Sequence, residues 1–419
     1  MINFFGYQIE PALFWTIVLG GAAILVTILF RFWPGRTKLP KSTEAVIDHL
    51  KQKVETIEKA AKEANENIKV LERHFGIPIY TDGLTSAPSP VFDPFAKGLK
   101  LMKEYKWDEA IVEFRQAMKE AKASQLVALY YLIGLCYYTP GKLVFAVENL
   151  NKSLAFSIEF SDKEGEASAL KSLGVIQVKR GNLTQAQKYL EDALKIFREI
   201  SNKVGEAWVL NDLGGTYKTE GDWDKAIKYY ENALKINLEI NNREGEAVAL
   251  GNLGLIYQAR GDLDQALRYH ENDLRIHREI GNKEGEAVAL NNLGLIYQAK
   301  KDWDQAIKYY ENALKINIEI SNKEGEAVAL GNLGAIYREK RDLDNALKYS
   351  QEALILNEEL GIKERIAIQL CNLGFIHYSK GNKGKALKYY EDALEIFTQF
   401  GDKKEIERTK EDIKILKSE

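Results

Sequence analysis

The sequence has little of several features that common functions require. Its two cysteines, Cys136 and Cys371, lie far apart and give no disulfide framework, so a reducing compartment fits most of the chain. The 58 basic and 61 acidic residues give a formal charge of -3, which leaves no basic excess for a nucleic-acid surface. We therefore expect no nucleic-acid partner.

Motifs for catalysis are also missing. The chain has no phosphate-cradling Gly-Lys-Ser/Thr loop, no nucleophile elbow and no zinc-type cysteine pattern. Of five scattered histidines, only His270 and His277 share a helix face with an acid, Asp273, and a metal there would need ligands from a neighbouring element. A locally loosened or solvated contact accounts for them better. We expect no enzyme activity, no catalytic residues, no metal and no cofactor.

One long apolar run interrupts an otherwise ordinary composition. Pro11 to Phe30 reads PALFWTIVLGGAAILVTILF, and twenty helical residues match a hydrocarbon core of about 30 Å. A cleaved signal peptide is the alternative, but the ten residues before the run contain no Lys or Arg, and no small-residue cleavage site follows. The sequence predicts a transmembrane helix over residues 11–33.

The charges beside this span predict its orientation. Glu10 is the only charged residue before it, whereas four basic residues follow: Arg31, Arg36, Lys38 and Lys41. By the positive-inside rule, residues 1–10 form a short extracytoplasmic N-terminus. The expected location is the membrane, single-pass, with the C-terminal domain in the cytoplasm.

The sequence of residues 42–75 predicts one long helix with a stripe of apolar residues, called the seam, along one face. The seam residues alternate in gaps of three and four, which is typical of a coiled coil and favours a parallel homodimer. The alternative is an amphipathic helix that folds back on its own chain. A Pro-rich linker is predicted over residues 76–91. The seam comprises Ile47, Leu50, Val54, Ile57, Ala61, Ala64, Ile68, Leu71 and Phe75.

Residues 92–400 repeat themselves. A glycine recurs after a first gap of 36 and later gaps of 40 residues, and an alanine follows twelve residues after each glycine. Each unit contains two helical patterns joined by a turn, and residues 401–419 predict a polar capping helix. The recurring glycines are Gly98, Gly134, Gly174, Gly214, Gly254, Gly294, Gly334 and Gly374. Turn aspartates placed to cap the second helix are Asp222, Asp262, Asp302 and Asp342.

These units resemble the tetratricopeptide repeat (TPR). The match rests on a Leu-Gly pair with an aromatic three residues later, as in Leu253, Gly254 and Tyr257, and on the recurring alanines. The 40-residue period is similar to that of kinesin light chains, LGN-type polarity adaptors and bacterial peptide-sensing regulators. The resemblance implies an all-α fold, a right-handed superhelical α-solenoid of about eight helix–turn–helix units, with the first helices on the concave wall.

Opposite its packing face, the first helix of each of the last four units carries an apolar stripe with one asparagine, and Ser172 and Asp212 replace it in the third and fourth units. Asparagine is a poor helix former, but its amide has two donors and an acceptor that can pair with a peptide backbone. In proteins that this chain resembles, such an asparagine ladder holds peptides. The predicted groove has Asp212, Asn252, Asn292, Asn332 and Asn372 as its ladder, Val248, Val288, Val328, Leu255 and Leu295 as its apolar surface, and Lys218, Gln258, Gln298 and Arg338 beside it.

Two alternatives to ligand binding stay open for the asparagines. They could bond to a neighbouring repeat and align the stack, or recent duplication could have copied them. The predicted function is a membrane-anchored adaptor or scaffold that binds a protein or peptide partner in this groove, on the cytoplasmic side. The alternative function is a peptide-responsive signalling regulator whose superhelix changes conformation on ligand binding.

Overall fold

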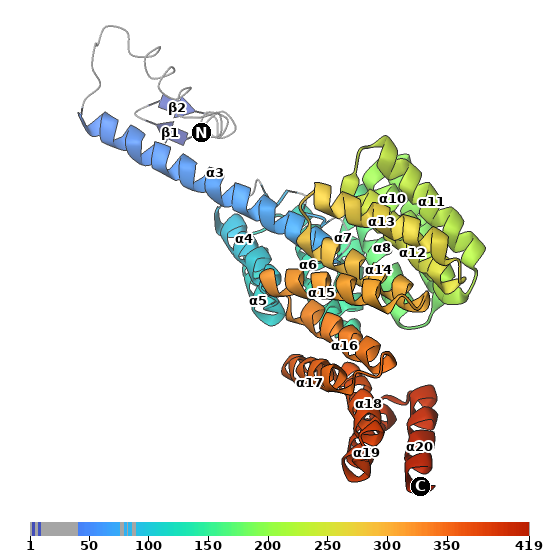
Figure 1. The fold of residues 1–419 in the computed structure, drawn as a ribbon. Helices are drawn as coiled ribbons and strands as arrows, with labels where there is room; N and C mark the ends of the chain where they lie inside the picture. Colours follow the sequence, from blue (N-terminus) through green and yellow to red (C-terminus); the bar gives the residue numbers. More distant parts are fainter. Residues whose placement is uncertain are drawn as a thin grey trace. The chain divides into compact units, whose positions relative to one another are not determined.

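The computed structural model describes residues 2–4, 7–9, 41–75, 79–81, 83–85 and 89–418. Strands β1 (Ile2–Phe4) and β2 (Tyr7–Ile9) form a small antiparallel hairpin, and helices make up nearly all the remaining described chain (Figure 1). Within those ranges no helix has the length and apolar character that a membrane span needs. The span predicted at 11–33 lies outside the described residues.

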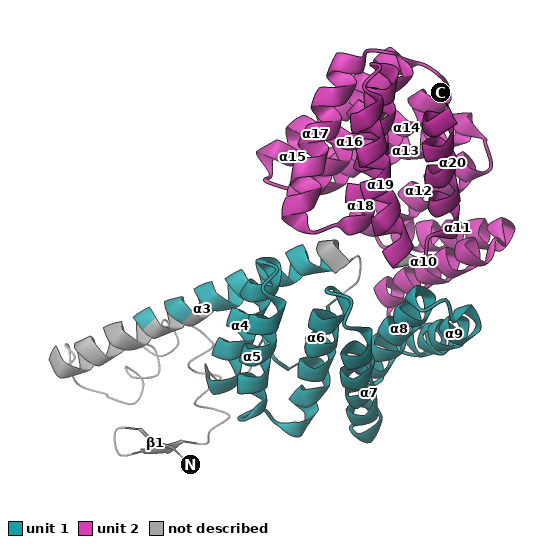
Figure 2. Cartoon of the chain, turned by 90° about the horizontal axis from the view of Figure 1, so that it is seen from below, with its two compact units in different colours: residues 1–201 teal, residues 202–419 magenta. Residues whose placement is uncertain are grey.

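The chain divides into two compact units, Met1–Ser201 and Asn202–Glu419, coloured separately in Figure 2. In the first unit α3 (Lys41–Phe75) precedes three helix pairs: α4 (Ser89–Lys103) with α5 (Trp107–Met118), α6 (Leu126–Tyr138) with α7 (Leu143–Glu159), and α8 (Lys163–Lys179) with α9 (Leu183–Glu199). A short 3₁₀ turn, η1 (Ala123–Gln125), leads into α6.

The second unit continues the pattern and ends in a single helix. We call the even-numbered helices from α4 to α18 first helices, the odd-numbered ones from α5 to α19 second helices, and each pair a repeat, numbered 1 to 8. The pairs are α10 (Lys203–Glu220) with α11 (Trp223–Glu239), α12 (Arg243–Ala259) with α13 (Leu263–Glu279), α14 (Lys283–Ala299) with α15 (Trp303–Glu319), α16 (Lys323–Glu339) with α17 (Leu343–Leu360), and α18 (Lys363–Ser379) with α19 (Lys383–Phe400), followed by α20 (Lys403–Ser418).

The recurring glycine brings the two helices of a repeat together. A Cβ added at Gly294 would lie 2.4 Å from Cε1 of Tyr310, a distance at which the ring must move. Ala306, twelve residues after this glycine, is fully buried on the facing helix. Small residues at the crossing therefore let the helices approach, and the large ring fills the space beside them.

The predicted turn caps are confirmed. The carboxylates of Asp222, Asp262, Asp302 and Asp342 each accept the backbone N–H three residues later, at the start of a second helix. A second set of caps was not predicted: Asn202, Asn242, Asn282 and Asn322 accept a glycine N–H at the start of a first helix. Both helices of these repeats thus begin at a capped residue, which fixes where they start.

Within the second unit, successive first helices lie directly against one another, from α10 to α18. Each second helix packs mainly against the first helices before and after it. We call this row of first helices the first-helix wall.

The helix predicted over 42–75 is present as α3, but the dimer seam is not supported. Ala64 and Leu71 are each 1% exposed and join the core of the first repeats, beside Phe95 of α4. The C-terminal half of the seam is therefore buried in its own chain, as the folding-back alternative predicts. The side chains of the N-terminal half of the seam lie outside the described residues.

The segment predicted as a linker also contributes to this core. Ile79, Tyr80 and Leu84 are buried, and α4 begins at Ser89, before the expected start of the array at residue 92. Pro90 falls in the first turn of α4, where a backbone N–H has no partner within the helix. The prolines marked an irregular segment, but its burial depends on contacts that composition does not reveal.

The polar C-terminal segment forms α20, which packs on α19. Thr409 and Leu416 are buried, and Ile406 and Ile413 pack partly against repeat 8. This helix covers the apolar face that a terminal repeat would otherwise expose to water.

Candidate functional site

Every predicted site residue lies in the second unit on a first helix. The ladder residues Asp212, Asn252, Asn292, Asn332 and Asn372 lie on α10, α12, α14, α16 and α18, one on each, and all are half-buried. Equivalent positions on neighbouring helices place these side chains in one row along the first-helix wall. Lys218, at the end of α10, is exposed.

The apolar residues of the wall differ in exposure. Val288 is 56% exposed, and Ile368 and Phe375 on α18 are 43% and 42% exposed. Such apolar surface, bordered by polar residues, is typical of an interaction site. The remaining predicted apolar positions are half-buried: Val248, Val328, Leu255 and Leu295.

Two of the asparagines are engaged within the protein. Nη1 of Arg338 donates to Oδ1 of Asn372 at 2.7 Å, and Nδ2 of Asn372 lies 3.4 Å from Oε1 of Gln369. Nδ2 of Asn332 donates to Oδ1 of Asn291 on the preceding first helix at 3.4 Å. In repeats 7 and 8 the asparagines thus join neighbouring first helices, as expected if they align the stack.

Asn252 and Asn292 differ from this pair. Among the described residues, their side-chain amides have no hydrogen-bond partner. Both residues are half-buried, so each keeps some contact with solvent. Each offers two donors and an acceptor to a ligand in repeats 5 and 6.

The glutamines beside the ladder also differ between repeats. The Tyr310 hydroxyl donates to Oε1 of Gln298 at 2.8 Å, and burial raises the pKa of Tyr310, which keeps that donor protonated. In repeat 5 His270 takes the place of this tyrosine, against Gly254. No hydrogen bond to a described residue is present for the side chain of Gln258, so repeat 5 leaves this amide available as well.

The histidine cluster in α13 is a buried packing irregularity. His270 is fully buried with both ring nitrogens unpartnered in the described structure, and burial lowers its pKa to about 4. Burial raises the pKa of Asp273, opposed by His277, whose Nε2 lies 3.1 Å from Oδ1 of Asp273. No group of three or more His, Cys, Asp or Glu side chains in the described ranges has a geometry that could hold a metal ion.

One row of residues on the wall was not predicted from the sequence: the residue just before each ladder position. Asn291 is buried there and accepts from Asn332, whereas Gly251 and Gly331 have no side chain at that position. A Cβ at Gly331 would lie 2.8 Å from Nε2 of Gln369, so the glycine makes room for that amide. The alternation of Gly and Asn within nearly identical repeats was the signal that could have revealed this row.

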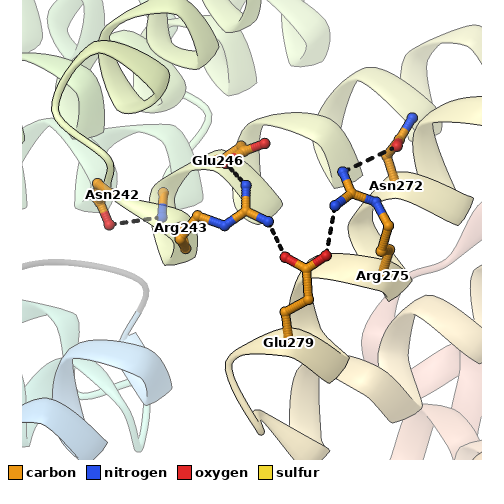
Figure 3. A network of polar contacts seen from close by, with 7 residues as sticks. Asn242, Arg243, Glu246, Asn272, Arg275 and Glu279 are labelled. Carbon is orange, nitrogen blue, oxygen red and sulfur yellow. Dashed lines mark hydrogen bonds and ion pairs between the residues drawn. The ribbon is translucent and has the colours of Figure 1, made fainter.

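Polar contacts fix the start of α12, which carries Asn252 (Figure 3). Arg243 contacts both Glu246 in the next turn and Glu279 at the end of α13, and Asn242 caps the helix by accepting the Gly245 N–H at 3.1 Å. Arg275 contacts the same Glu279 carboxylate at 2.6 Å. The network ties the first helix of repeat 5 to the end of its second helix.

Comparisons with known proteins agree with this architecture. A tetratricopeptide repeat model matches residues 125–199, 165–239, 245–319 and 325–399, more than half of the chain. No curated protein matches it.

Several solved structures share the fold. A Signal Transduction ATPase with Numerous Domains from Pyrococcus horikoshii, which has a tetratricopeptide repeat sensor, is 18% identical with a TM-score of 0.59, over 79% of this chain and 50% of that one. The apo quorum sensor NprR from B. thuringiensis is 16% identical with a TM-score of 0.56, over 82% and 99%. Apo RapI is 16% identical with a TM-score of 0.52, over 66% and 99%. With the helix pairs, their glycine crossings and the family match in agreement, the chain belongs to the tetratricopeptide repeat family.

Proposed function

We propose that the first-helix wall of repeats 5 and 6 binds an extended peptide from a protein partner. The observation that carries this is the pair Asn252 and Asn292: equivalent positions on neighbouring helices, half-buried and without a partner among the described residues. Packed helices lie about 8–10 Å apart, which is close to three residues of extended chain at about 3.3 Å each. Two amides at that spacing suit the backbone of one peptide, and the exposed Val288, one turn before Asn292 on α14, suits an apolar side chain of that peptide.

The test is a pair of matched double variants. We expect Asn252→Ala with Asn292→Ala to weaken partner capture at least about tenfold, since each lost hydrogen bond costs about 1 kcal/mol. Its melting temperature should stay near that of the wild type, because these amides make no bond within the described chain. The control is Asn332→Ala with Asn372→Ala, which removes bonds inside the protein and should lower the melting temperature instead. Equal loss of capture by both variants, or unfolding of the first, contradicts the proposal.

We further propose that this binding module acts as an adaptor at a membrane. The support is the uncharged run within residues 11–33 and the basic residues after it, which favour a cytoplasmic repeat array. Alkaline extraction of native membranes should leave the wild-type chain in the pellet and release a Leu19→Arg, Ile24→Arg variant. Release of the wild type would contradict the anchor. Of the dimer predicted through residues 42–75, only pairing through the N-terminal half of the seam stays a prediction, because Ala64 and Leu71 are buried in their own chain; sedimentation of the full chain over a range of concentrations tests it.

A peptide-responsive regulator is the second candidate, favoured by the bonds in repeats 7 and 8. Asn332 with Asn291, and Arg338 with Asn372, join successive first helices. A ligand that competes for these amides would release each helix from its neighbour. Small-angle scattering of the chain with and without a captured peptide distinguishes the candidates, because a rigid adaptor keeps its radius of gyration.

A further inference from the structure

Between α3 and α4 the structure describes residues 79–81 and 83–85, which belong to a turn. The backbone N–H of Ile79 donates to the Glu72 carboxylate of α3 at 3.1 Å, and the N–H of Leu84 donates to the Thr81 carbonyl at 3.1 Å. Gly83 has a φ of +67°, a conformation that glycine adopts without strain. This backbone geometry holds the side chains of the turn in place.

Residues of the turn contact α6, the residue just before it, and the residue that caps α8. The Tyr80 ring meets the Tyr131 ring of α6 edge-on, with centroids 6.2 Å apart, and its hydroxyl donates to the carboxylate of Asp162 at the start of α8. Nε2 of Gln125, just before α6, donates to the Gly83 carbonyl at 2.7 Å. A bound peptide makes interactions of these three kinds: an aromatic contact, a hydrogen bond from a hydroxyl to a carboxylate, and a hydrogen bond from a side-chain amide to a backbone carbonyl.

In repeats 2 and 3, these contacts lie at positions equivalent to those that form the first-helix wall. The Tyr131 hydroxyl lies 3.5 Å from that of Ser172, and Ser172 occupies in repeat 3 the position of Asn292 in repeat 6. In repeats 6 and 7 the positions equivalent to Tyr131 and Ser172 hold Asn291 and Asn332, which are also joined by a hydrogen bond. The turn therefore packs beside the ladder positions of repeats 2 and 3.

These repeats lack the amides that a foreign peptide would use. Their ladder positions hold Leu132 and Ser172 in place of asparagine, and Leu132 is fully buried. Leu84 is itself fully buried, and Ile79 and Tyr80 are only 6% and 7% exposed. This part of the array is thus filled by its own chain.

We propose that Ile79, Tyr80 and Leu84 form an intrachain ligand of the first helices of repeats 2 and 3, a surface that selects a tyrosine-bearing peptide. The assignment of first helices as a peptide surface rests on the proposed function. Tyr80 is the specificity residue, because its ring fits Tyr131 and its hydroxyl reaches Asp162. A partner peptide of the same chemistry competes with the turn for this site.

The test supplies the turn in trans. The probe is a fluorescent synthetic peptide of residues 79–85, IYTDGLT, and the receptor is the full chain carrying Tyr80→Ala and Leu84→Ala. We expect the peptide to bind this variant at least about tenfold more tightly than the wild type, whose site is filled. A peptide with phenylalanine in place of Tyr80 should bind several-fold more weakly, because it cannot donate to Asp162.

The full-chain Tyr80→Phe variant covers the case in which the double variant fails to fold. It keeps the ring but loses the hydroxyl, so it should admit the peptide more readily than the wild type does. Equal peptide binding by wild type and a folded variant, or no binding by either, overturns the proposal. Adding Asn252→Ala and Asn292→Ala to the Tyr80→Ala, Leu84→Ala receptor should leave binding of the residue 79–85 peptide unchanged. A failure of this proposal can therefore be distinguished from a failure of the proposed function.

Discussion

Asn332 and Asn372 bond to Asn291 and Arg338 within the protein, while the amides of Asn252 and Asn292 stay available to a ligand. The length of a nearby side chain decides part of this difference. Arg338 is long enough to reach the next first helix, whereas Gln298 at the equivalent position bonds within its own repeat, to Tyr310. The residue at this position thus decides whether Asn372 is occupied.

Shortening that side chain should extend the ladder. Arg338→Gln gives repeat 7 the residue found in repeats 5 and 6 and removes the donor to Asn372. We expect a several-fold gain in partner affinity, because Oδ1 of Asn372 becomes available to accept one further hydrogen bond, worth about 1 kcal/mol. Titration calorimetry with the captured peptide measures it. Unchanged affinity would show that Asn372 lies outside the bound segment.

His270 should make the stability of the chain depend on pH. Its pKa is lowered to about 4 in the folded chain, against about 6.5 in an unfolded one, so folding loses stability as pH falls from about 6.5 towards 4. Between pH 7 and 5 this loss amounts to about 2 kcal/mol, and His270→Tyr should remove it. Asp273 acts in the opposite sense, since its raised pKa favours the protonated folded chain at still lower pH.

The matched control for this prediction is Tyr310→His, which places the same residue in repeat 6. Chemical denaturation of the three proteins at pH 7 and pH 5 gives the comparison. We expect the acid loss to shrink in His270→Tyr and to grow in Tyr310→His. An identical loss in wild type and His270→Tyr would assign the acid sensitivity to other groups.

At the scale of the element, the helices start and stop where local chemistry directs them. The turn aspartates were predictable because an N-cap contact involves residues only three apart. The docking site of α3 was not predictable, since a coiled-coil seam and a helix docked on its own chain share the same apolar period. Its partner was decided by α4, which buries Ala64 and Leu71.

Two aspartates beside the first turn of α15 allow a sharp test of capping. Asp302 accepts the Gln305 N–H, whereas Asp304 contacts Lys340 at 2.7 Å with a side chain that is 88% exposed. Asp302→Ala should cost about 1 kcal/mol of unfolding free energy, and Asp304→Ala less than about 0.5, because solvent screens an exposed ion pair. Denaturant unfolding in low and high salt measures both. A larger loss at Asp304 would make the ion pair the stronger contact.

At the scale of the whole molecule, stability is shared between neighbouring repeats, so each end needs cover. At the C-terminal end, α20 places Thr409 3.7 Å from the thiol of Cys371, and burial raises the pKa of that thiol to about 11. Burial and the raised pKa both suppress reaction of Cys371 with thiol reagents. The second cysteine, Cys136, is fully buried in the first unit.

Removal of residues 403–419 should therefore expose one thiol. We expect Cys371 to react at least about tenfold faster with a disulfide reagent at pH 7, because its pKa returns towards the ordinary value of about 8.5. Cys136 serves as the internal control and should not change. Hydrogen exchange should quicken in α18 and α19 but not in α12, since repeats contact only their neighbours. An unchanged rate of reaction of Cys371 with the disulfide reagent would mean that α20 does not cover repeat 8.

The sequence by itself determined the repeat period, the helix pairs, the turn caps and the row of asparagines. These follow from local spacing: a glycine opposite a tyrosine, or an aspartate three residues before an N–H, acts the same way in each copy that has it. Tertiary structure decided which asparagines are occupied, where α3 docks and that Tyr80 packs beside repeats 2 and 3. Those outcomes depend on side chains that are tens of residues apart in the sequence and in contact in the fold, such as Arg338 with Asn372 and Tyr80 with Asp162. The repeat pattern does not predict such contacts.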